Sequence, residues 1–415
     1  MTQISSDKKA FNNKLISLNS AKIKILKSIK LNLSDKYINT INSLGHIIST
    51  PIFAPINVPA YSNSAVDGYA LRFKDLKNNK YRKFLIVGQS NAGHPYKNKL
   101  NKNEIIRVLT GATIPKNADT IIMEEDCLLK DNIIFLPKNI IKGMNFRLYG
   151  EDIKIKKKVF DKGHKIRPQD IGILSSLGIY KIKTVKKITI SIFSSGDELL
   201  NSNKKLSNGK IYDANRSMLI SFLKKLNCNV IDLGIIKDNQ EKIYKTLVKA
   251  SKQSQLIISS GGMSLGDQDY IKKIMENKGT LKIWRLAIKP GRPVGFGNFN
   301  QTYFLGLPGN PAAAFVTFLM LGAPIIKKLS GEKNYNPISH NIPINFYHSK
   351  KIGRKEFLRV KLDNNKYVLE NFSRAGAGIL SSASWANGLG IIEENIENIK
   401  PGDKINYISF NELLN

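Results

Sequence analysis

The chain has 415 residues with a formal net charge of +33 at pH 7, and 42% of the residues are hydrophobic. A chain of this length is longer than a typical domain with one hydrophobic core, so we expect roughly two to four domains. The lysines are spread over every segment instead of clustering, so the charge does not indicate a nucleic-acid groove, although it can steer anionic ligands.

Three features of the sequence that are absent bear on the compartment of the protein and on its association with membranes. The two cysteines, Cys127 and Cys228, have no paired spacing, which argues against a disulfide framework or a zinc site and for a reducing compartment. The N-terminal segment lacks the apolar core of a signal peptide. The longest apolar run, 312–326, is interrupted by Gly322 and Pro324 and is shorter than the ~20 residues of a membrane span. We therefore expect a cytoplasmic protein without membrane or nucleic-acid partners.

The first half of the chain predicts a helical linker region and a small β domain. Apolar residues at helical spacing predict two short helices within 15–50, the first around Ile23 and Leu26 and the second around Ile38 and Ile41. Three prolines then mark an extended connector, and short β-rich runs follow from 84 to 134. We expect residues 55–149 to form a β domain inserted into a helical and extended linker domain made of 1–54 and 150–186.

From residue 187 strands alternate with helices, which predicts a three-layer α/β domain with a parallel sheet over 187–336. The expected strands are 188–193, 230–236, 256–258, 283–288 and 303–307. After residue 337 the pattern is again β and predicts a small barrel-like domain over 337–415. The predicted fold class is thus multi-domain α/β plus β.

Unusual loops follow the expected strands of the α/β domain instead of preceding them. Their sequences are SSGDE, KD, SSGGMSLGD, KPGRP and LPGNP. In a parallel sheet such loops share one edge, where ligands bind. Five structural turns are the alternative, but the shared edge favours one functional cleft.

The loop SSGGMSLGDQDY, residues 259–270, combines features of an anion site and a metal site. Gly261 and Gly262 let the backbone bend and approach a ligand, together with Ser264 and Gly266, and free N–H groups at the next helix favour negative charge. The aspartates Asp267 and Asp269 would repel a phosphate unless a cation such as Mg²⁺ lies between them. An ordinary turn with helix-capping aspartates is the alternative, and it is preferred for one such loop in isolation.

The expected edge of the sheet carries both signs of charge. Its acids are Asp197, Glu198, Asp213, Asp238, Asp267 and Asp269, and its cations are Lys289 and Arg292. This mixture suits a phosphate-containing ligand bridged by a divalent metal. A P-loop and a dinucleotide-binding motif are both absent from the sequence, and the residues alone leave the substrate unnamed.

Nine motifs together are specific although each is weak alone. They are NSAVDGYA, TGATIP with ADTIIMEE, GED, SSGDEL, GKIYDAN, SSGGMSLGDQDY, KPGRPVGFG and LPGNP. In order and spacing they resemble the molybdopterin molybdenumtransferase family, called MoeA in bacteria and related to the C-terminal part of gephyrin. The resemblance implies Mg²⁺-dependent insertion of molybdate into adenylylated molybdopterin, with release of AMP. It also implies an elongated homodimer whose cleft lies between the α/β domain of one subunit and the inserted domain of the other.

The resemblance assigns site residues motif by motif. In and near the inserted domain these are Asp67, Thr110, Arg147 and Asp152. In the α/β domain they are Glu198, Asp238, Asp269, Arg285, Lys289, Pro308 and Pro311. We expect Glu198, Asp238 and Asp269 to hold the metal, while Ser195 and Arg292 join the substrate-binding residues. Arg285 and Arg292 stand where the family has lysine, so charge persists while hydrogen-bond geometry changes.

Three other functions compete with this one. Adenylyltransfer to molybdopterin belongs to a family that resembles only the α/β domain, and a molybdopterin adenylyltransferase is instead the expected upstream partner. A scaffold without turnover is disfavoured by the acidic residues at the sheet edge. A nucleic-acid binder is the least favoured.

Overall fold

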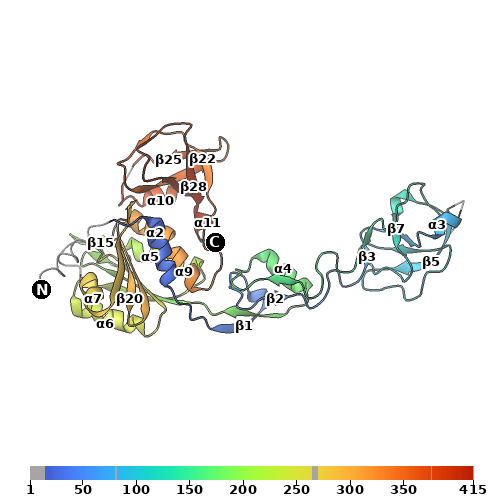
Figure 1. The fold of residues 1–415 in the computed structure, drawn as a ribbon, viewed down its shortest axis with the longest axis horizontal. Coiled ribbons are helices and arrows are strands. Elements are labelled where there is room, and N and C mark those ends of the chain that lie inside the picture. The colour runs from blue at the N-terminus through green and yellow to red at the C-terminus, as the bar shows by residue number, and fades with distance from the viewer. Residues whose placement is uncertain (1–14, 80–81, 132, 264–269, 375, 415) are drawn as a thin grey trace.

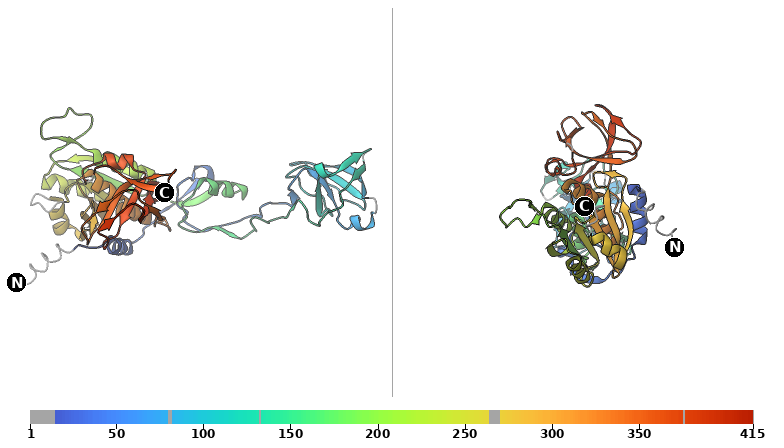
Figure 2. Two further views of the ribbon diagram at one scale, coloured as in Figure 1. Left: turned by 90° about the horizontal axis from the view of Figure 1, so that it is seen from above. Right: turned by 90° about the vertical axis from the view of Figure 1, so that its left-hand side faces the viewer.

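The computed structural model describes residues 15–79, 82–131, 133–263, 270–374 and 376–414. Figure 1 shows an elongated chain with an α/β region and a C-terminal β region together at one end and a small β region at the other. The left view of Figure 2 shows two runs of chain crossing between them past α4 (Pro168–Ser176). This agrees with an insertion, and we propose the boundaries 54/55, 149/150, 186/187 and 336/337 for the four domains.

The α/β region is built on a six-stranded sheet with the order β16-β13-β17-β21-β20-β18. In chain order its strands are β13 (Thr189–Ser195), β16 (Asn229–Ile236), β17 (Leu256–Ser260), β18 (Thr280–Arg285), β20 (Pro293–Phe299) and β21 (Thr302–Leu307). Its helices are α5 (Ala214–Lys225), α6 (Gln240–Ser251), α7 (Tyr270–Lys278), α8 (Pro311–Thr317) and α9 (Ala323–Leu329), with a π-helical turn at Phe318–Gly322 between the last two. The predicted strands and helices of this region occur with shifted ends, except that the predicted strand 283–288 is divided between β18 and β19 (Ile288–Lys289), which joins another sheet.

Alternation along the strands divides the core into two layers. Ile190 and Ile192 of β13 face one cluster, which includes α5, α8 and α9, whereas Phe193 faces the cluster of α6 and α7. Successive strand side chains point to opposite faces of a sheet, so both faces are covered by helices. The N-terminal helix α2 (Leu18–Ser28) joins the first cluster.

The expectation of a purely parallel sheet was wrong at one strand. Strand β20 runs antiparallel to both of its neighbours, β18 and β21. A two-residue turn at Asn300 and Gln301, with φ of 46° and 67°, joins β20 to β21, and such left-handed pairs make tight hairpins. Because β18 is antiparallel to β20, it points the same way as β21, and the KPGRP loop after β18 still reaches the expected edge.

The helical segment Pro311–Leu329 is long and apolar enough to cross a membrane, and it is the one such segment among the described residues. It is 94% buried inside the protein. Its side chains form much of the first core cluster, which accounts for its apolar character.

The prediction of a second helix near the N-terminus is wrong. Residues Asp35–Asn39 form strand β1, followed by a short 3₁₀ turn at Thr40–Asn42. The strand pairs antiparallel with β12 (Lys181–Val185), which lies about 150 residues later in the chain. This long-range pairing overrides the local helical spacing of Ile38 and Ile41.

The distant β region has a six-stranded sheet with the order β7-β4-β6-β5-β9-β8. Its strands are β4 (Gly68–Leu71), β5 (Lys83–Ser90), β6 (Glu104–Val108), β7 (Thr120–Met123), β8 (Leu128–Lys130) and β9 (Ile133–Phe135), and one short helix is α3 (Asp75–Asn78). Two short ladders lie between this sheet and the rest of the chain. They pair β2 (Ile52–Phe53) with β11 (Lys158–Phe160), and β3 (Asn63–Ser64) with β10 (Phe146–Arg147).

The C-terminal region has a sheet with the order β19-β24-β26-β28-β22, and β25 also pairs with β24. Its elements are β19 (Ile288–Lys289), β22 (His340–Pro343), β23 (His348–Ser349), β24 (Lys355–Asp363), β25 (Val368–Asn371), β26 (Gly388–Ile392), β27 (Asn398–Ile399), β28 (Lys404–Ser409), α10 (Ser381–Trp385) and α11 (Phe410–Leu414). Strand β19 comes from the KPGRP segment, so this loop of the α/β region extends the C-terminal sheet.

Candidate functional site

A cleft of about 580 Å³ opens at the carboxyl ends of the parallel strands. Seven predicted site residues line it: Ser195, Glu198, Asp238, Gly261, Gly262, Pro308 and Pro311. They come from loops after four different strands, β13, β16, β17 and β21. The prediction that these loops share one edge and one cleft is confirmed.

The paired glycines after β17 are required by the turn. Gly261 and Gly262 have φ of +85° and +66°, which L side chains rarely adopt. A Cβ on Gly261 would lie 2.6 Å from the carbonyl oxygen of Ser195, and one on Gly262 would lie 2.5 Å from Ile271 Cδ1. However, the N–H of Gly261 donates to the carbonyl of Leu307 at 3.2 Å, so it is not available to hold a phosphate.

Hydrogen bonds connect two of the acidic loops. Ser195 Oγ donates to Asp238 Oδ1 at 2.6 Å, and the N–H of Asp238 donates to Asp197 Oδ1 at 3.3 Å. Glu198 and Asp238 are themselves exposed at the cleft. The Asp238 carboxylate is therefore oriented by Ser195 through Oδ1, while its other oxygen faces the cleft together with the exposed Glu198 carboxylate.

Asp213 has a structural role at the same edge. It caps α5 by accepting from the N–H of Arg216 at 3.1 Å, and its other oxygen accepts from Arg216 Nε at 2.9 Å. The guanidinium also bonds Asp232 at 2.5 Å. A buried carboxylate in such a pair stabilises the start of α5 and leaves little capacity for a metal.

The oxygen donors at the cleft suit a hard cation such as Mg²⁺, which is held by one or two carboxylates, water and substrate oxygens. Glu198 and Asp238 provide such carboxylates. Within the described residues no three His, Cys, Asp or Glu side chains form a metal-binding group. Asp269, the third expected ligand, lies outside the described residues, as do Ser264 and Gly266.

Sequence reasoning missed Asn215, which lies in the first turn of α5 and lines the cleft. Its side-chain Nδ2 donates to Ser260 Oγ at 2.9 Å and to the carbonyl of Gly309 at 2.7 Å. One side chain thus ties the glycine loop to the LPGNP loop. Asn215 is the last residue of the motif GKIYDAN, which precedes the helical pattern of α5. This position could have marked Asn215 as a site residue.

A second, basic cavity of about 240 Å³ adjoins the cleft, with Gly291 and Ala377 lining both. Lys289 and Arg292 line this cavity and not the cleft, so their predicted place beside the acids is corrected to the neighbouring space. The other charged groups there come from the C-terminal sheet and its loops: His348, Arg354, Glu356, Arg359 and Arg374. Arg285 ends β18 and lines neither space.

The C-terminal region closes the cleft through its glycine-rich turn. Arg359 is buried and donates to Ser382 Oγ at 3.0 Å and to the carbonyl of Gly376 at 3.2 Å. The carbonyl of Ala377 accepts from the N–H of Ala312 in α8 at 3.0 Å. Arg359 thereby fixes the turn that separates the cleft from the cavity.

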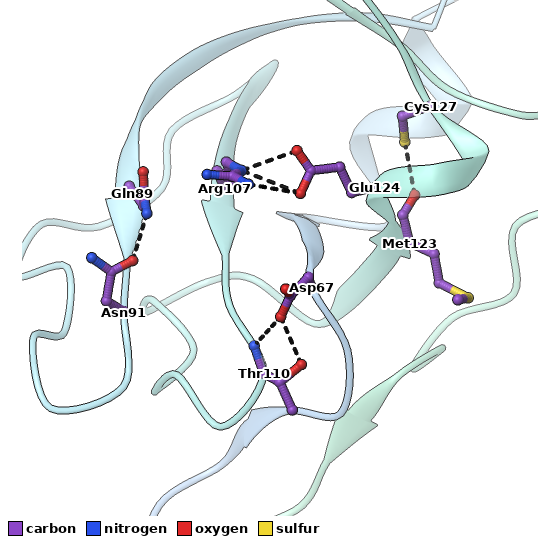
Figure 3. A network of polar contacts seen from close by, with 8 residues as sticks. All are labelled: Asp67, Gln89, Asn91, Arg107, Thr110, Met123, Glu124 and Cys127. Carbon is purple, nitrogen blue, oxygen red and sulfur yellow. Dashed lines mark hydrogen bonds and ion pairs between the residues drawn. The ribbon is translucent and has the colours of Figure 1, made fainter.

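Asp67 and Thr110 lie together in the distant β region, as Figure 3 shows. Asp67 Oδ1 accepts from both the N–H and the hydroxyl of Thr110, each at 2.7 Å. These bonds from Thr110 lower the pKa of the exposed Asp67 carboxyl. Nearby, Arg107 forms an ion pair with Glu124 at 2.9 Å. The structure supports a small polar site here.

Arg147 and Asp152 are exposed near the base of the same region. Arg147 ends β10, and the N–H of Asp152 donates to the carbonyl of Val58 at 3.1 Å. Figure 1 shows these segments far from the α/β sheet. Within one chain, the inserted-domain residues are therefore not brought to the cleft.

The thiols take no part in either space. Cys127 and Cys228 are both free, and burial raises the pKa of each to about 12. A thiol with so high a pKa is almost entirely protonated at neutral pH and is therefore a weak nucleophile.

Comparison with known proteins defines the class. The MoeA N-terminal region (domain I and II) matches residues 16–178, a probable molybdopterin binding domain matches 191–328, and the MoeA C-terminal region (domain IV) matches 342–410. The chain thus carries three successive regions, in order, of a protein of molybdopterin biosynthesis.

Individual relatives match between 70% and 96% of this chain. The chain is 35% identical to the molybdopterin molybdenumtransferase of Haemophilus influenzae, over 96% of this chain and 100% of the relative. It is 33% identical to gephyrin of Dictyostelium discoideum over 70% of this chain and 46% of gephyrin. The crystal structure of the molybdopterin biosynthesis MoeA protein from Pyrococcus horikoshii OT3 matches with a TM-score of 0.84, 26% identity and 96% coverage of this chain, and 100% of that structure is covered. This chain belongs to the molybdopterin molybdenumtransferase (MoeA) family.

Proposed function

We propose that this chain is a transferase that inserts molybdenum from molybdate into adenylylated molybdopterin, releasing AMP and forming molybdenum cofactor. The observation that supports this best is the acidic cleft joined to a basic cavity. An organic phosphate that binds together with a divalent metal suits the acidic cleft, and a small oxyanion suits the basic cavity. The two spaces adjoin, so the two ligands can react. The full-length similarity to a relative named molybdopterin molybdenumtransferase supports the same reaction.

In this proposal the cleft binds adenylylated molybdopterin. Helices α5 and α8 both begin at the cleft, so their first residues form part of its wall. Glu198 and Asp238, with Asp269, would hold Mg²⁺, which supplies positive charge to the phosphate oxygens when bound. Ser195 holds Asp238 in place, and Pro308, Pro311 and the paired glycines shape the wall.

The basic cavity binds molybdate in this proposal. Lys289 and Arg292 line it, and Arg285 at the end of β18 adds positive charge in the same loop region. Cationic side chains stabilise a bound oxyanion and the charge that develops on a departing phosphate. The two substrates would then meet where Gly291 and Ala377 line both spaces.

We further propose a homodimer, because Asp67, Thr110, Arg147 and Asp152 reach no cleft within their own chain. A partner subunit could present them to the opposite cleft. We also propose a cytoplasmic location, no membrane or nucleic-acid partner, and a molybdopterin adenylyltransferase as the upstream supplier of substrate.

One assay tests the proposal directly. Purified protein is incubated with adenylylated molybdopterin, Mg²⁺ and molybdate, and AMP is followed by chromatography. We expect AMP release that depends on molybdate and stops when EDTA removes Mg²⁺. Absence of molybdate-dependent AMP from a folded dimer would overturn the proposed function, and full AMP release by both Asp238→Ala and Asp269→Ala would overturn the metal sites.

A further inference from the structure

Lys289 is attached to the C-terminal sheet through both its backbone and its side chain. Strand β19 pairs in parallel with β24, and Lys289 is in register with Glu356. The ammonium of Lys289 lies 2.9 Å from Glu356 Oε1. A residue of the α/β region that faces the basic cavity is therefore held by a residue of the C-terminal region.

The two partners of this ion pair differ in exposure. The side chain of Lys289 is 48% exposed, whereas that of Glu356 is 6% exposed. The second carboxylate oxygen, Oε2, lies 3.4 Å from His348 Nε2 and forms no hydrogen bond with a described residue. Burying an ionised carboxylate is costly unless it is paired, so the ion pair with Lys289 is the main contact that compensates Glu356.

The charges around Glu356 explain why it stays ionised. Burial would raise its pKa, but the nearby His348 and the ion pair with Lys289 lower the pKa of Glu356 below its usual range. Lys350 and Arg359 also interact with its charge. The carboxylate is thus a fixed negative charge at the wall of a cavity whose other charged lining residues, within the described part of the chain, are basic.

We propose that Glu356 is a positioning residue, which holds the ammonium of Lys289 at the cavity where the oxyanion binds. This inference rests on the proposed function. A lysine has a flexible four-carbon stem and loses much rotamer freedom when its end is fixed. A fixed carboxylate at 2.9 Å supplies that constraint before the anion arrives, and it gives the C-terminal region a role in the reaction.

Charge alone makes the opposite prediction. A carboxylate in a basic cavity repels an anion, so removing it would strengthen anion binding if Glu356 acted only through its charge. A positioning role requires that its removal weaken anion binding. The direction of the change therefore separates the two.

The test compares Glu356→Gln, Glu356→Ala and Glu356→Asp in the full-length protein. We expect Glu356→Ala to raise KM for molybdate by roughly tenfold, the size of a lost charged hydrogen bond, while the affinity for adenylylated molybdopterin in the neighbouring cleft is unchanged. Glu356→Asp should recover part of the loss. Should Glu356→Ala fail to fold, the nearly isosteric Glu356→Gln carries the comparison.

Glu393→Gln is the matched control. Glu393 forms an ion pair with Lys355 at 2.8 Å, and Lys355 is the residue directly before Glu356 in β24. Glu393 does not line the cavity. Its loss removes an ion pair of similar length without touching Lys289. We expect an unchanged KM for molybdate, and an equal rise in both variants would show a merely structural effect.

A double-mutant cycle decides whether Glu356 acts through Lys289. If it does, Glu356→Gln has no further effect on molybdate affinity once Lys289→Met is present. Equilibrium dialysis with molybdate measures the cycle without turnover, so it also works if the wild-type protein releases no AMP. Additive losses, or tighter binding by Glu356→Gln, would overturn the inference while leaving the proposed function standing.

Discussion

The cleft at the strand ends and the cavity beside it carry opposite charge. The described residues that line the cleft include Glu198, Asp213 and Asp238 but no lysine or arginine. The cavity has Lys289 and four arginines against one carboxylate, Glu356. The loops after the parallel strands thus provide the acids, whereas the C-terminal region contributes most of the cations.

This difference suggests how two anionic substrates can be kept apart before they react. An acidic cleft accepts a phosphate ligand when a divalent metal accompanies it, so it discriminates against a bare oxyanion. A basic cavity binds the bare oxyanion directly. If the two spaces act separately, a change in the cleft and a change in the cavity affect different substrates.

Loss of a cleft carboxylate should have the largest effect. We expect Asp238→Asn to reduce molybdate-dependent AMP release on the order of 100-fold, because it removes an oxygen donor to the metal and to the loop network. Chromatographic assay of AMP measures this. The control is Glu241→Gln, which breaks an exposed ion pair with Lys245 on α6 and should release AMP at the wild-type rate. AMP release by Asp238→Asn at the wild-type rate would refute the role of the cleft acids.

Loss of a cavity cation should affect molybdate alone. We expect Arg292→Ala to raise KM for molybdate by about tenfold, consistent with one charged hydrogen bond, and to leave the affinity for adenylylated molybdopterin unchanged. Steady-state kinetics with each substrate varied in turn measures both. Lys245→Ala, which removes one exposed positive charge, is the control for net charge. A parallel loss of both affinities would show that the two spaces do not act separately.

The sequence predicted the cleft well because strand order and loop position are local signals. Apolar runs followed by glycine, proline and acidic residues located the edge, and Gly261 and Gly262 fit the expected tight turn. The basic cavity could not be predicted in the same way. Glu356 and Arg359 lie in an ordinary apolar strand pattern, and only the pairing of β19 with β24 brings them beside Lys289.

The errors in the fold have the same origin. Ile38 and Ile41 have helical spacing, but residues Asp35–Asn39 form a strand whose partner is far away in sequence. Strand β20 contains Gly295 and Gly297, which weaken a strand pattern, and a Cβ on Gly297 would lie 1.7 Å from the carbonyl oxygen of Thr280 on the neighbouring strand. Contacts between strands that are distant in sequence determine both β1 and β20, and no local sequence pattern shows such contacts.

The glycine turn at the cleft should be sensitive to a single methyl group. We expect Gly261→Ala to lower the free energy of unfolding by about 1–3 kcal/mol, because φ is +85° and the Cβ would lie 2.6 Å from Ser195 O. Gly172→Ala in α4, where nothing lies within 4 Å, should instead be neutral or stabilising by about 0.5–1 kcal/mol. Urea unfolding measures both. Equal effects would show that the turn does not need its glycines.

A carboxylate remote from both spaces should change stability and leave substrate affinities intact. Asp170 in α4 is buried, which would raise its pKa, but hydrogen bonds from Arg167 and His164 lower the pKa of Asp170 below the usual 3.8. A lowered folded-state pKa contributes stability above the unfolded pKa, and this contribution is lost as the pH falls through the folded value. We therefore expect Asp170→Asn to cost about 1.5–3 kcal/mol at pH 7, with the difference from wild type shrinking below about pH 4. Urea unfolding across this pH range measures the difference. A constant difference down to pH 2 would show that the Asp170 charge does not stabilise this region, and a changed KM for either substrate would show that the linker region influences the cleft or the cavity.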